Sequence, residues 1–413
     1  MSTSRIPGLH NMSRAERLAK VAAEAGLSNA EVAHLVEAGA HAGELADHLS
    51  ENVISVMEIP LGVATNLIVD GEDVLVPMAS EESSVIAAVC NGARACRGAG
   101  GVTCEADDPC MIAQVQVTGL DDLAAARALV AGKKNEIGAL CDGCDPMLVS
   151  LGGGFRDLEV RIAGPFLVVH LFVDVRDAMG ANAVNTMAER LAPLLEEWTG
   201  GKVGLRILSN LADRRLVRAR ATWPASEIGE ATVDGIVSAW NFAHHDPYRA
   251  ATHNKGIMNG VAAVALATGN DTRALEAGAH AFAATRGAAG GYGPLTRYWK
   301  EGGDLVGEIE MPMAVGIVGG ATKAHPTAQA CLAIMGATDA ARLARVTAAV
   351  GLIQNFSALR ALATEGIQRG HMGLHARNVA IVAGATGEEI DRVAAEMIRR
   401  GTVREDVARE ILG

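Results

Sequence analysis

The sequence has 413 residues, and 36 Lys and Arg against 48 Asp and Glu give a formal net charge of −12. Apolar residues make up 49% and charged residues 20% of the chain, so it can bury a sizeable core and does not have the composition of a disordered chain. The negative charge argues against a general nucleic-acid binder, and 3% aromatic residues argue against a stacking platform for single strands.

The hydropathy pattern gives no sign of a membrane span. Mean hydropathy is +0.20, but the longest apolar stretches, residues 260–268 and 311–319, are far shorter than the roughly 20 residues of a spanning helix. Residues 1–16 contain no apolar segment of the secretory type. Seven cysteines, an odd number in a long chain, indicate reduced thiols. We therefore expect a cytoplasmic protein that binds neither membranes nor nucleic acids.

The first part of the chain favours helices followed by a hairpin. Ser13 with Glu16, and Ser28 with Glu31, form capping boxes that predict the starts of two helices. Residues 63–76 alternate between apolar and polar and contain a central Asp-Gly pair, which predicts a hairpin.

A further helix is expected from Ser80 to about Cys96. Glu81 and Glu82 would then lie in its first turn, where carboxylates suit the positive end of the helix dipole.

Residues 111–209 differ in pattern from the preceding part of the chain and predict a small α/β domain. The element order is β-α-β-β-α-β, which is the ferredoxin-like arrangement. Residues 150–154 are rich in glycine but lead into a strand, so they predict neither a P-loop nor a Rossmann turn. The expected strands are residues 112–117, 158–163, 166–173 and 203–209, and the expected helices are residues 120–140 and 181–198.

The rest of the chain is predicted to be mostly helical. The fold class is therefore α+β, with a large, mostly helical domain interrupted by the small domain and followed by a helical tail. Two capping boxes, at Thr386 and Thr402, predict two short terminal helices. The other expected helices are residues 227–243, 258–267, 272–285, 338–356 and 357–368, with one extended stretch at residues 305–311.

Residues 246–260 are dense in polar groups. We predict a loop here, because Pro247 and Gly256 disfavour a regular helix. Arg249 can clamp a carboxylate or phosphate, and Lys255 is a compact cation. A solvated loop without a site is the competing interpretation, at about even odds.

Other candidate residues have structural explanations that are, taken singly, as good as functional ones. Asp271 suits a helix N-cap, and Glu82 suits the positive end of a helix dipole. A lone histidine such as His371 more often has a surface or core position than a catalytic role. Cys141 and Cys144 form a CxxC pair, but no second pair with zinc-site spacing exists, so we expect no metal.

Five long motifs, taken together, resemble hydroxymethylglutaryl-CoA reductases of the soluble bacterial class. The resemblance runs from about Arg5 to the C-terminus, so it covers nearly the whole chain. Because the motifs are long and occur in the right order, they outweigh the structural explanations of single residues. The motifs are residues 77–84, 174–182, 246–260, 311–322 and 361–372.

The resemblance implies roles for individual residues. The implied catalytic residues are Glu82, Lys255, Asp271 and His371. The implied contacts to the hydroxymethylglutaryl group are Ser84, Arg249, Thr252, Asn259 and Asn355. The implied contacts to the nicotinamide cofactor are Asp145, Asp177, Met179, Gly180, Ala181, Asn182 and Asn210.

The implied reaction interconverts hydroxymethylglutaryl-CoA with mevalonate and CoA. It uses two NAD(H) and passes through mevaldyl-CoA and mevaldehyde. Lys255 would stabilise the negative charge on the carbonyl oxygen, and Glu82 would supply its proton. His371 would protonate the CoA thiolate, and Asp271 would lie between Lys255 and Glu82.

NAD(H) is expected in preference to NADP(H). A carboxylate at Asp145 can accept hydrogen bonds from a ribose 2′-hydroxyl and repels a 2′-phosphate. No Arg or Lys lies between Glu136 and Gly154 to receive that phosphate. The sequence departs from the resembling family at Ser83, which replaces a proline, and at His10, where the family can carry a basic residue for the CoA phosphate.

The resemblance also implies a domain plan and an assembly. Residues 1–109 and 211–370 would form the large CoA-substrate domain, residues 110–210 the small NAD domain, and residues 371–413 a mobile flap. The chain would work as a homodimer or an assembly of dimers, with Glu82 and Lys255 meeting across the interface.

Two other functions are weighed. One is a CoA-binding relative that has lost catalysis, although all four catalytic positions are filled. The other is an aldolase-like enzyme in which Lys255 forms a Schiff base.

Overall fold

The computed structural model describes residues 4–41, 43–288, 290–364 and 367–413, apart from the side chains of residues 321, 367–372 and 374. Contacts divide the chain into two units, Met1–Leu61 and Gly62–Gly413. In the first unit both predicted capping boxes are confirmed, because Glu16 and Glu31 accept the backbone N–H groups of Ser13 and Ser28 at 2.8 and 2.7 Å. Its elements are η1 (Leu9–Asn11), α1 (Arg14–Ala25), α2 (Asn29–His41) and α3 (Leu45–Leu49).

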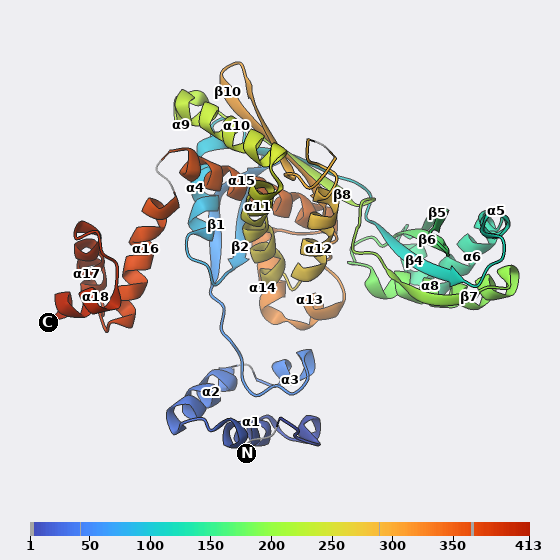
Figure 1. Ribbon diagram of the computed structural model, residues 1–413, viewed down its shortest axis with the longest axis horizontal. Coiled ribbons are helices and arrows are strands. Elements are labelled where there is room, and N and C mark those ends of the chain that lie inside the picture. The colour runs from blue at the N-terminus through green and yellow to red at the C-terminus, as the bar shows by residue number, and fades with distance from the viewer. Residues whose placement is uncertain (1–3, 42, 289, 365–366) are drawn as a thin grey trace. The chain divides into compact units, whose positions relative to one another are not determined.

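The larger of two sheets has six strands in the order β2-β1-β3-β8-β10-β9 (Figure 1). The predicted hairpin is confirmed, since β1 and β2 are neighbours joined by Asp70 and Gly71, with φ of 51° and 83°. Three strands were not predicted, β3, β8 and β9. The strands are β1 (Leu61–Val69), β2 (Glu72–Ala79), β3 (Val102–Ala106), β8 (Leu216–Trp223), β9 (Thr296–Glu301) and β10 (Asp304–Pro312).

Several helices adjoin this sheet and share its core, among them α4 (Val85–Arg97), α10 (Glu230–His245), α11 (Pro247–Ala267) and α15 (Ala340–Ala363). The short helix α9 (Ala225–Ile228) precedes α10. Trp223 lies at the centre of this core. Its ring stacks on Phe356 of α15 at 4.1 Å, and its Nε1 donates to the carbonyl of Gly92 in α4 at 3.1 Å. Among the described helices, α15 alone is long and apolar enough to cross a membrane, and 67% of its most apolar window is buried.

Three predictions about these helices are wrong. Residues 246–260 are not a loop, because α11 is continuous from Pro247 to Ala267. Pro247 occupies the first helical turn, where its missing N–H costs nothing. The two helices expected in residues 338–368 are joined through Phe356 in α15. Glu82 precedes α4 instead of lying in its first turn.

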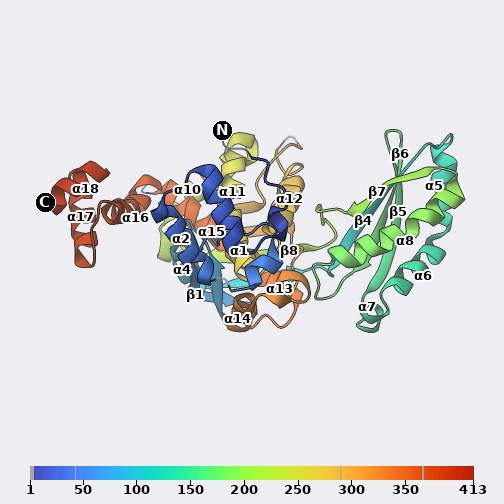
Figure 2. The same ribbon diagram turned by 90° about the horizontal axis from the view of Figure 1, so that it is seen from below.

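The second sheet has four strands in the order β5-β6-β4-β7, all antiparallel to their neighbours. The element order is the predicted β-α-β-β-α-β, although the first helical stretch is divided. Figure 2 shows α8 lying along this sheet, and the two bury a separate core that includes Val115, Leu171 and Leu191. The elements are β4 (Cys110–Thr118), α5 (Leu123–Gly132), α6 (Lys134–Cys144), α7 (Pro146–Ser150), β5 (Gly154–Ala163), β6 (Phe166–Asp174), α8 (Ala181–Thr199) and β7 (Lys202–Leu208).

The C-terminal helices have a small third core that includes Ala380, Val393, Met397 and Ala408. The two predicted terminal helices are present as α17 and α18, and a helix that was not predicted, α16, precedes them. The remaining helices are α12 (Thr272–Ala283), α13 (Gly320–Ala324), α14 (Pro326–Met335), α16 (Ile367–Val382), α17 (Glu388–Arg399) and α18 (Glu405–Leu412).

Candidate active site

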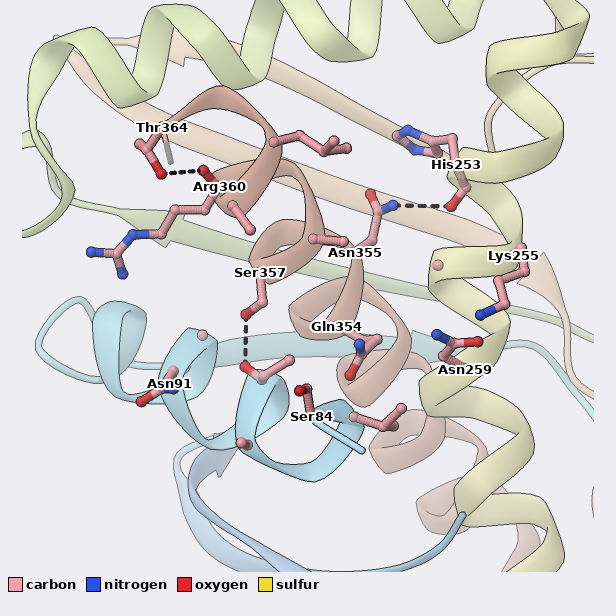
Figure 3. Close-up of a pocket in the computed structure, with 18 of the residues that line it drawn as sticks. Ser84, Asn91, His253, Lys255, Asn259, Gln354, Asn355, Ser357, Arg360 and Thr364 are labelled. Atoms are coloured by element: carbon pink, nitrogen blue, oxygen red, sulfur yellow. Dashed lines mark hydrogen bonds between the residues drawn. The ribbon is translucent and has the colours of Figure 1, made fainter. Parts of the chain in front are cut away.

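A cavity of about 990 Å³ opens where α4, α11 and α15 meet, beside the first turn of α10. This volume lies near the upper end of the range for small-molecule sites. Figure 3 shows side chains from these helices around it, with Ser84, Gln354 and Asn259 near its centre. Seven of the predicted site residues line the cavity: Glu82, Ser84, Arg249, Thr252, Lys255, Asn259 and Asn355.

Lys255 and Glu82 form an ion pair in this cavity. Nζ of Lys255 donates a hydrogen bond of 2.8 Å to Oε2 of Glu82. Both residues belong to one chain, so the prediction that they meet across a subunit interface is wrong. Their side chains are 59% and 40% exposed, so a ligand can reach the pair.

The helical state of α11 explains how its residues share one cavity. Residues three or four apart lie on the same face of a helix, and Arg249, Thr252, Lys255 and Asn259 follow that spacing. Burial lowers the pKa of Arg249. Within the described part of the chain its guanidinium has no ion-pair partner, which leaves it available to an anion.

A closed ring of hydrogen bonds forms the buried floor of the cavity. Nε2 of His253 lies 2.6 Å from Oγ1 of Thr296, which donates to Oδ1 of Asn355 at 3.1 Å. Nδ2 of Asn355 donates to the carbonyl of His253 at 3.2 Å. The amide of Asn355 therefore links α11 to β9. This structural role accounts for an asparagine at position 355 without any contact to a substrate.

Two polar atoms beside this ring have no hydrogen-bond partner among the described residues, Nδ1 of His253 and Oε1 of Gln354. Both residues line the cavity, with exposures of only 1% and 5%. Burial, followed by the positive charge of Arg249, lowers the pKa of His253 to about 3. His253 is therefore neutral at physiological pH. His253 lies inside the motif of residues 246–260, and Gln354 precedes Asn355, but nothing else in the sequence pointed to either residue.

Asp271 does not lie between Lys255 and Glu82 of its own chain. Its Oδ1 accepts the N–H groups of Arg273 and Ala274, at 2.9 and 3.1 Å, as the N-cap of α12. Lys255 and the C-terminal end of α11 at Ala267 are separated by about 18 Å along the helix axis. Asp271 follows that end, and it is absent from the described lining of the cavity.

His371 belongs to α16. Its side chain lies outside the described residues, so its predicted role stays a prediction.

The predicted cofactor residues 177–182 form one turn that leads into α8. Oδ1 of Asp177 accepts the N–H of Ala340 at 2.9 Å, which fixes this turn to α15. Gly180 has a φ of 98°, and a Cβ there would lie 2.6 Å from a side-chain carbon of Val175. Because Gly180 offers no side-chain cap, the first N–H groups of α8 are available to an anion such as a phosphate.

The other two predicted cofactor residues lie elsewhere. Oδ1 of Asp145 accepts the N–H of Leu148 at 2.9 Å and caps α7, and Asn210 lies in the turn after β7. Arg190 of α8 lies beside the thiol of Cys144, the residue that precedes Asp145 in the sequence.

The described residues contain no group of three or more His, Cys, Asp or Glu suited to a metal ion. Cys141 and Cys144 are free thiols on α6. Burial raises the pKa of Cys141 to about 12, so its reactive thiolate form is disfavoured.

Comparison with known proteins identifies the family. The profile of hydroxymethylglutaryl-coenzyme A reductase matches residues 13–376. The chain belongs to the hydroxymethylglutaryl-coenzyme A (HMG-CoA) reductase family. Members of this family interconvert HMG-CoA and mevalonate, so the resemblance seen in the five motifs is confirmed.

Individual HMG-CoA reductases show how close the similarity is. The enzyme from Archaeoglobus fulgidus is 56% identical over 99% of this chain and 94% of its own length. A probable HMG-CoA reductase from Borreliella burgdorferi is 33% identical over 88% of this chain and 86% of its own length. The class II HMG-CoA reductase structure from Streptococcus pneumoniae, bound to NADPH in open conformations, is 38% identical with a TM-score of 0.76, covering 97% of this chain and 99% of that chain.

Proposed function

We propose that this chain interconverts HMG-CoA with mevalonate and CoA, using two NAD(H), through mevaldyl-CoA and mevaldehyde. The observation that carries the proposal is the Lys255–Glu82 pair in a cavity whose wall also holds an unpaired Arg249. A carbonyl that is reduced needs a cation for its oxygen and a proton donor beside it, and this pair offers both.

Substrate binding completes the chemistry of this pair. Arg249 would clamp the carboxylate of the hydroxymethylglutaryl group, with Ser84, Thr252 and Asn259 as further contacts. A substrate seated here would shield Glu82 and Lys255 from water, and Glu82 would supply the proton to the carbonyl oxygen. We assign Asn355 a positioning role, because its amide is already used in the buried ring.

The cofactor is proposed to bind at the turn before α8. When bound, the nicotinamide supplies or accepts the hydride. Asp177, Met179, Gly180, Ala181 and Asn182 would hold the dinucleotide, whose phosphates suit the uncapped N-terminus of α8. Asn210 and Asp145 would be further contacts, with Asp145 favouring NAD(H).

A second copy of the chain would complete the site. Asp271 is too far along α11 to act on Lys255 of its own chain, so we assign its catalytic role to the site of a partner subunit. His371 would protonate the CoA thiolate from the flap, residues 371–413. The large domain, residues 1–109 and 211–370, would bind substrate, and residues 110–210 would bind cofactor in a cytoplasmic homodimer or assembly of dimers.

Initial rates in both directions, with NADH and with NADPH, test the proposal. We expect CoA thiol release from HMG-CoA with NADH, and loss of this reaction in Lys255→Ala and Glu82→Gln. No rate with either cofactor in the folded protein would contradict the function and would favour the inactive CoA-binding relative.

A further inference from the structure

A buried arginine adjoins the cofactor turn, residues 177–182, which is proposed to bind the dinucleotide. Arg215 directly precedes β8, and only 4% of it is exposed. Its Nη1 donates to the carbonyls of Ala178 and Met179 at 3.2 and 3.3 Å, and its Nη2 donates to the carbonyl of Val315. One guanidinium therefore joins the cofactor turn to the segment that follows β10.

The guanidinium of Arg215 forms no ion pair with a carboxylate among the described residues. Asp177 attracts it, but Oδ1 of Asp177 already accepts the N–H of Ala340. Burial lowers the pKa of Arg215 to about 10, so the side chain still carries its charge at physiological pH. Burying a charge without a counter-ion is costly. Packing does not explain this cost, because an apolar side chain of similar volume would pack as well.

The hydrogen bonds from Arg215 set the direction of a peptide group in the cofactor turn. In a planar trans peptide the C=O and the following N–H point in opposite directions. Because the carbonyl of Met179 faces Arg215, the N–H of Gly180 faces away from the guanidinium. Gly180 is the N-cap of α8, and the N–H groups at this helix end are the proposed phosphate contacts. Arg215 therefore fixes the orientation of a donor at the position proposed to meet the dinucleotide.

Gly316 holds the same turn from a second side. A Cβ at Gly316 would lie 2.4 Å from the backbone nitrogen of Met179, so only glycine lets the two backbones approach this closely. The N–H of the next residue, Ile317, donates to the carbonyl of Asp177 at 2.9 Å. The cofactor turn is thus clamped between Arg215 and the backbone that follows β10.

We infer that Arg215 is a positioning residue for the cofactor, which holds the cofactor turn in the conformation that binds the dinucleotide phosphates. This inference rests on the proposed function, in which that turn binds the cofactor. Arg215 acts through the carbonyls of Ala178 and Met179 and is assigned no contact of its own with the dinucleotide. A turn that is already ordered loses less binding free energy to ordering when the ligand arrives. Affinity for the dinucleotide is therefore the quantity that depends on Arg215.

The test measures Kd for NADH, and for NADPH in parallel, by nicotinamide fluorescence without substrate. In Arg215→Met we expect Kd of the tighter-binding cofactor to rise about tenfold or more, the loss usual for hydrogen bonds to a charged group. KM for HMG-CoA should stay unchanged. Arg215→Lys keeps the charge but lacks the planar fork that reaches two segments, so it should recover only part of the affinity. Full recovery in Arg215→Lys would show that charge alone acts and would overturn the positioning role.

Arg214→Met is the matched control. Arg214 is the preceding residue, is exposed and lies over the ring of Phe172 at 5.3 Å, so Kd for the cofactor should stay at the wild-type value. Gly316→Ala disturbs the turn from its other side with Arg215 intact, so it decides the matter if Arg215→Met does not fold. It should raise Kd for the cofactor and leave KM for HMG-CoA unchanged. An unchanged Kd, or equal rises of both constants, in the folded variants would overturn the inference.

Binding of the dinucleotide separates this inference from the proposed function, because it requires no reduction of HMG-CoA. A tenfold rise of Kd in Arg215→Met, with no reductase rate in the wild type, would contradict the proposed function alone. Reduction of HMG-CoA by the wild type, with equal Kd in wild type and Arg215→Met, would overturn the inference alone. No binding of either dinucleotide by the wild type would contradict both.

Discussion

Nζ of Lys255 lies 2.8 Å from Oε2 of Glu82 in the same chain, whereas Asp271 caps a helix that begins beyond the far end of α11. The first two residues therefore lie in one cavity together, and under the proposed function the third would reach it from another copy of the chain.

Mixing two inactive variants tests whether Asp271 and the Lys255–Glu82 pair of one active site come from different chains. Lys255→Ala mixed with Asp271→Asn should recover activity, because the heterodimer keeps one site with Lys255 and Glu82 from one chain and Asp271 from the other. Random exchange would restore about a quarter of wild-type activity. The matched control is Glu82→Gln mixed with Lys255→Ala, which should recover nothing. Recovery in the control mixture after verified subunit exchange would contradict the shared origin of Lys255 and Glu82.

The hydroxyl of Thr296 holds the buried ring together. Thr296→Val keeps the shape of the side chain but leaves Nε2 of His253 and Oδ1 of Asn355 without their partner. We expect the free energy of unfolding to fall by about 1–3 kcal/mol, measured with urea. Thr103→Val, at an exposed hydroxyl on β3, should cost about 0.5 kcal/mol or less. Equal losses would show that the ring has no special role.

The buried neutral His253 predicts how stability depends on pH. Its pKa is about 3 in the folded state and about 6.5 in the unfolded state. The unfolded state therefore binds more protons between these values, so this contribution to stability is full above about pH 6.5 and falls by up to about 1.4 kcal/mol per pH unit below it. His253→Gln should flatten the decline between about pH 6.5 and 4. His34→Gln, at an exposed histidine, should leave it unchanged, and an unchanged slope in His253→Gln would contradict the burial argument.

The preference for NADH or NADPH tests the roles of Asp145 and Arg190. We expect kcat/KM to be higher with NADH than with NADPH, and Asp145→Ala should narrow that gap. Arg190 lies beside Cys144, which precedes Asp145 in the sequence, so we test it as a cation for a 2′-phosphate. Arg190→Met should leave the rate with NADH unchanged if NAD(H) is the natural cofactor. A higher kcat/KM with NADPH that falls in Arg190→Met would reverse the assignment.

Removal of the C-terminal helices tests the flap. Residues after Gly373 have their own small core, so truncation there should leave the core around Trp223 folded and NADH binding nearly intact. Reduction of HMG-CoA should be lost. Reduction of free mevaldehyde should be spared more, because that step has no thiolate to protonate. Equal loss of both reactions in a folded protein would contradict the flap.

Local signals in the sequence predict the local features of the fold well. The capping boxes at Ser13 and Ser28, and the Asp-Gly hairpin, depend on neighbouring residues alone. The strands of the small sheet are rich in apolar residues, and β4 alternates between buried and half-buried positions from Ala113 to Thr118. The strands β3 and β8 were missed because they pair with each other although they lie far apart in the sequence. Strand β9 pairs with β10 directly after it, and this hairpin was not recognised.

The residues of the candidate site could likewise be predicted only in part from the sequence. Seven of its residues could be named from the family resemblance, six of them inside its motifs. Pro247 and Gly256 nevertheless led us to predict a loop and not the helix that places Arg249 and Lys255 together. Helix α11 forms because tertiary packing outweighs the cost of an internal glycine. Arg94, Arg360 and Gln354 carry no motif signal of their own, since only the crossing of α4 and α15 brings them to one cavity.

The indole of Trp223 touches both helices that wall the cavity, through the Phe356 ring on α15 and the Gly92 carbonyl on α4. Trp223 has no exposed surface, so its emission depends on these two contacts and not on solvent. A ligand that changes the crossing of α4 and α15 would alter the indole stacking and the hydrogen bond at once. Trp223 is thus a built-in optical reporter of cavity occupancy, one that needs neither a label nor a coupled assay.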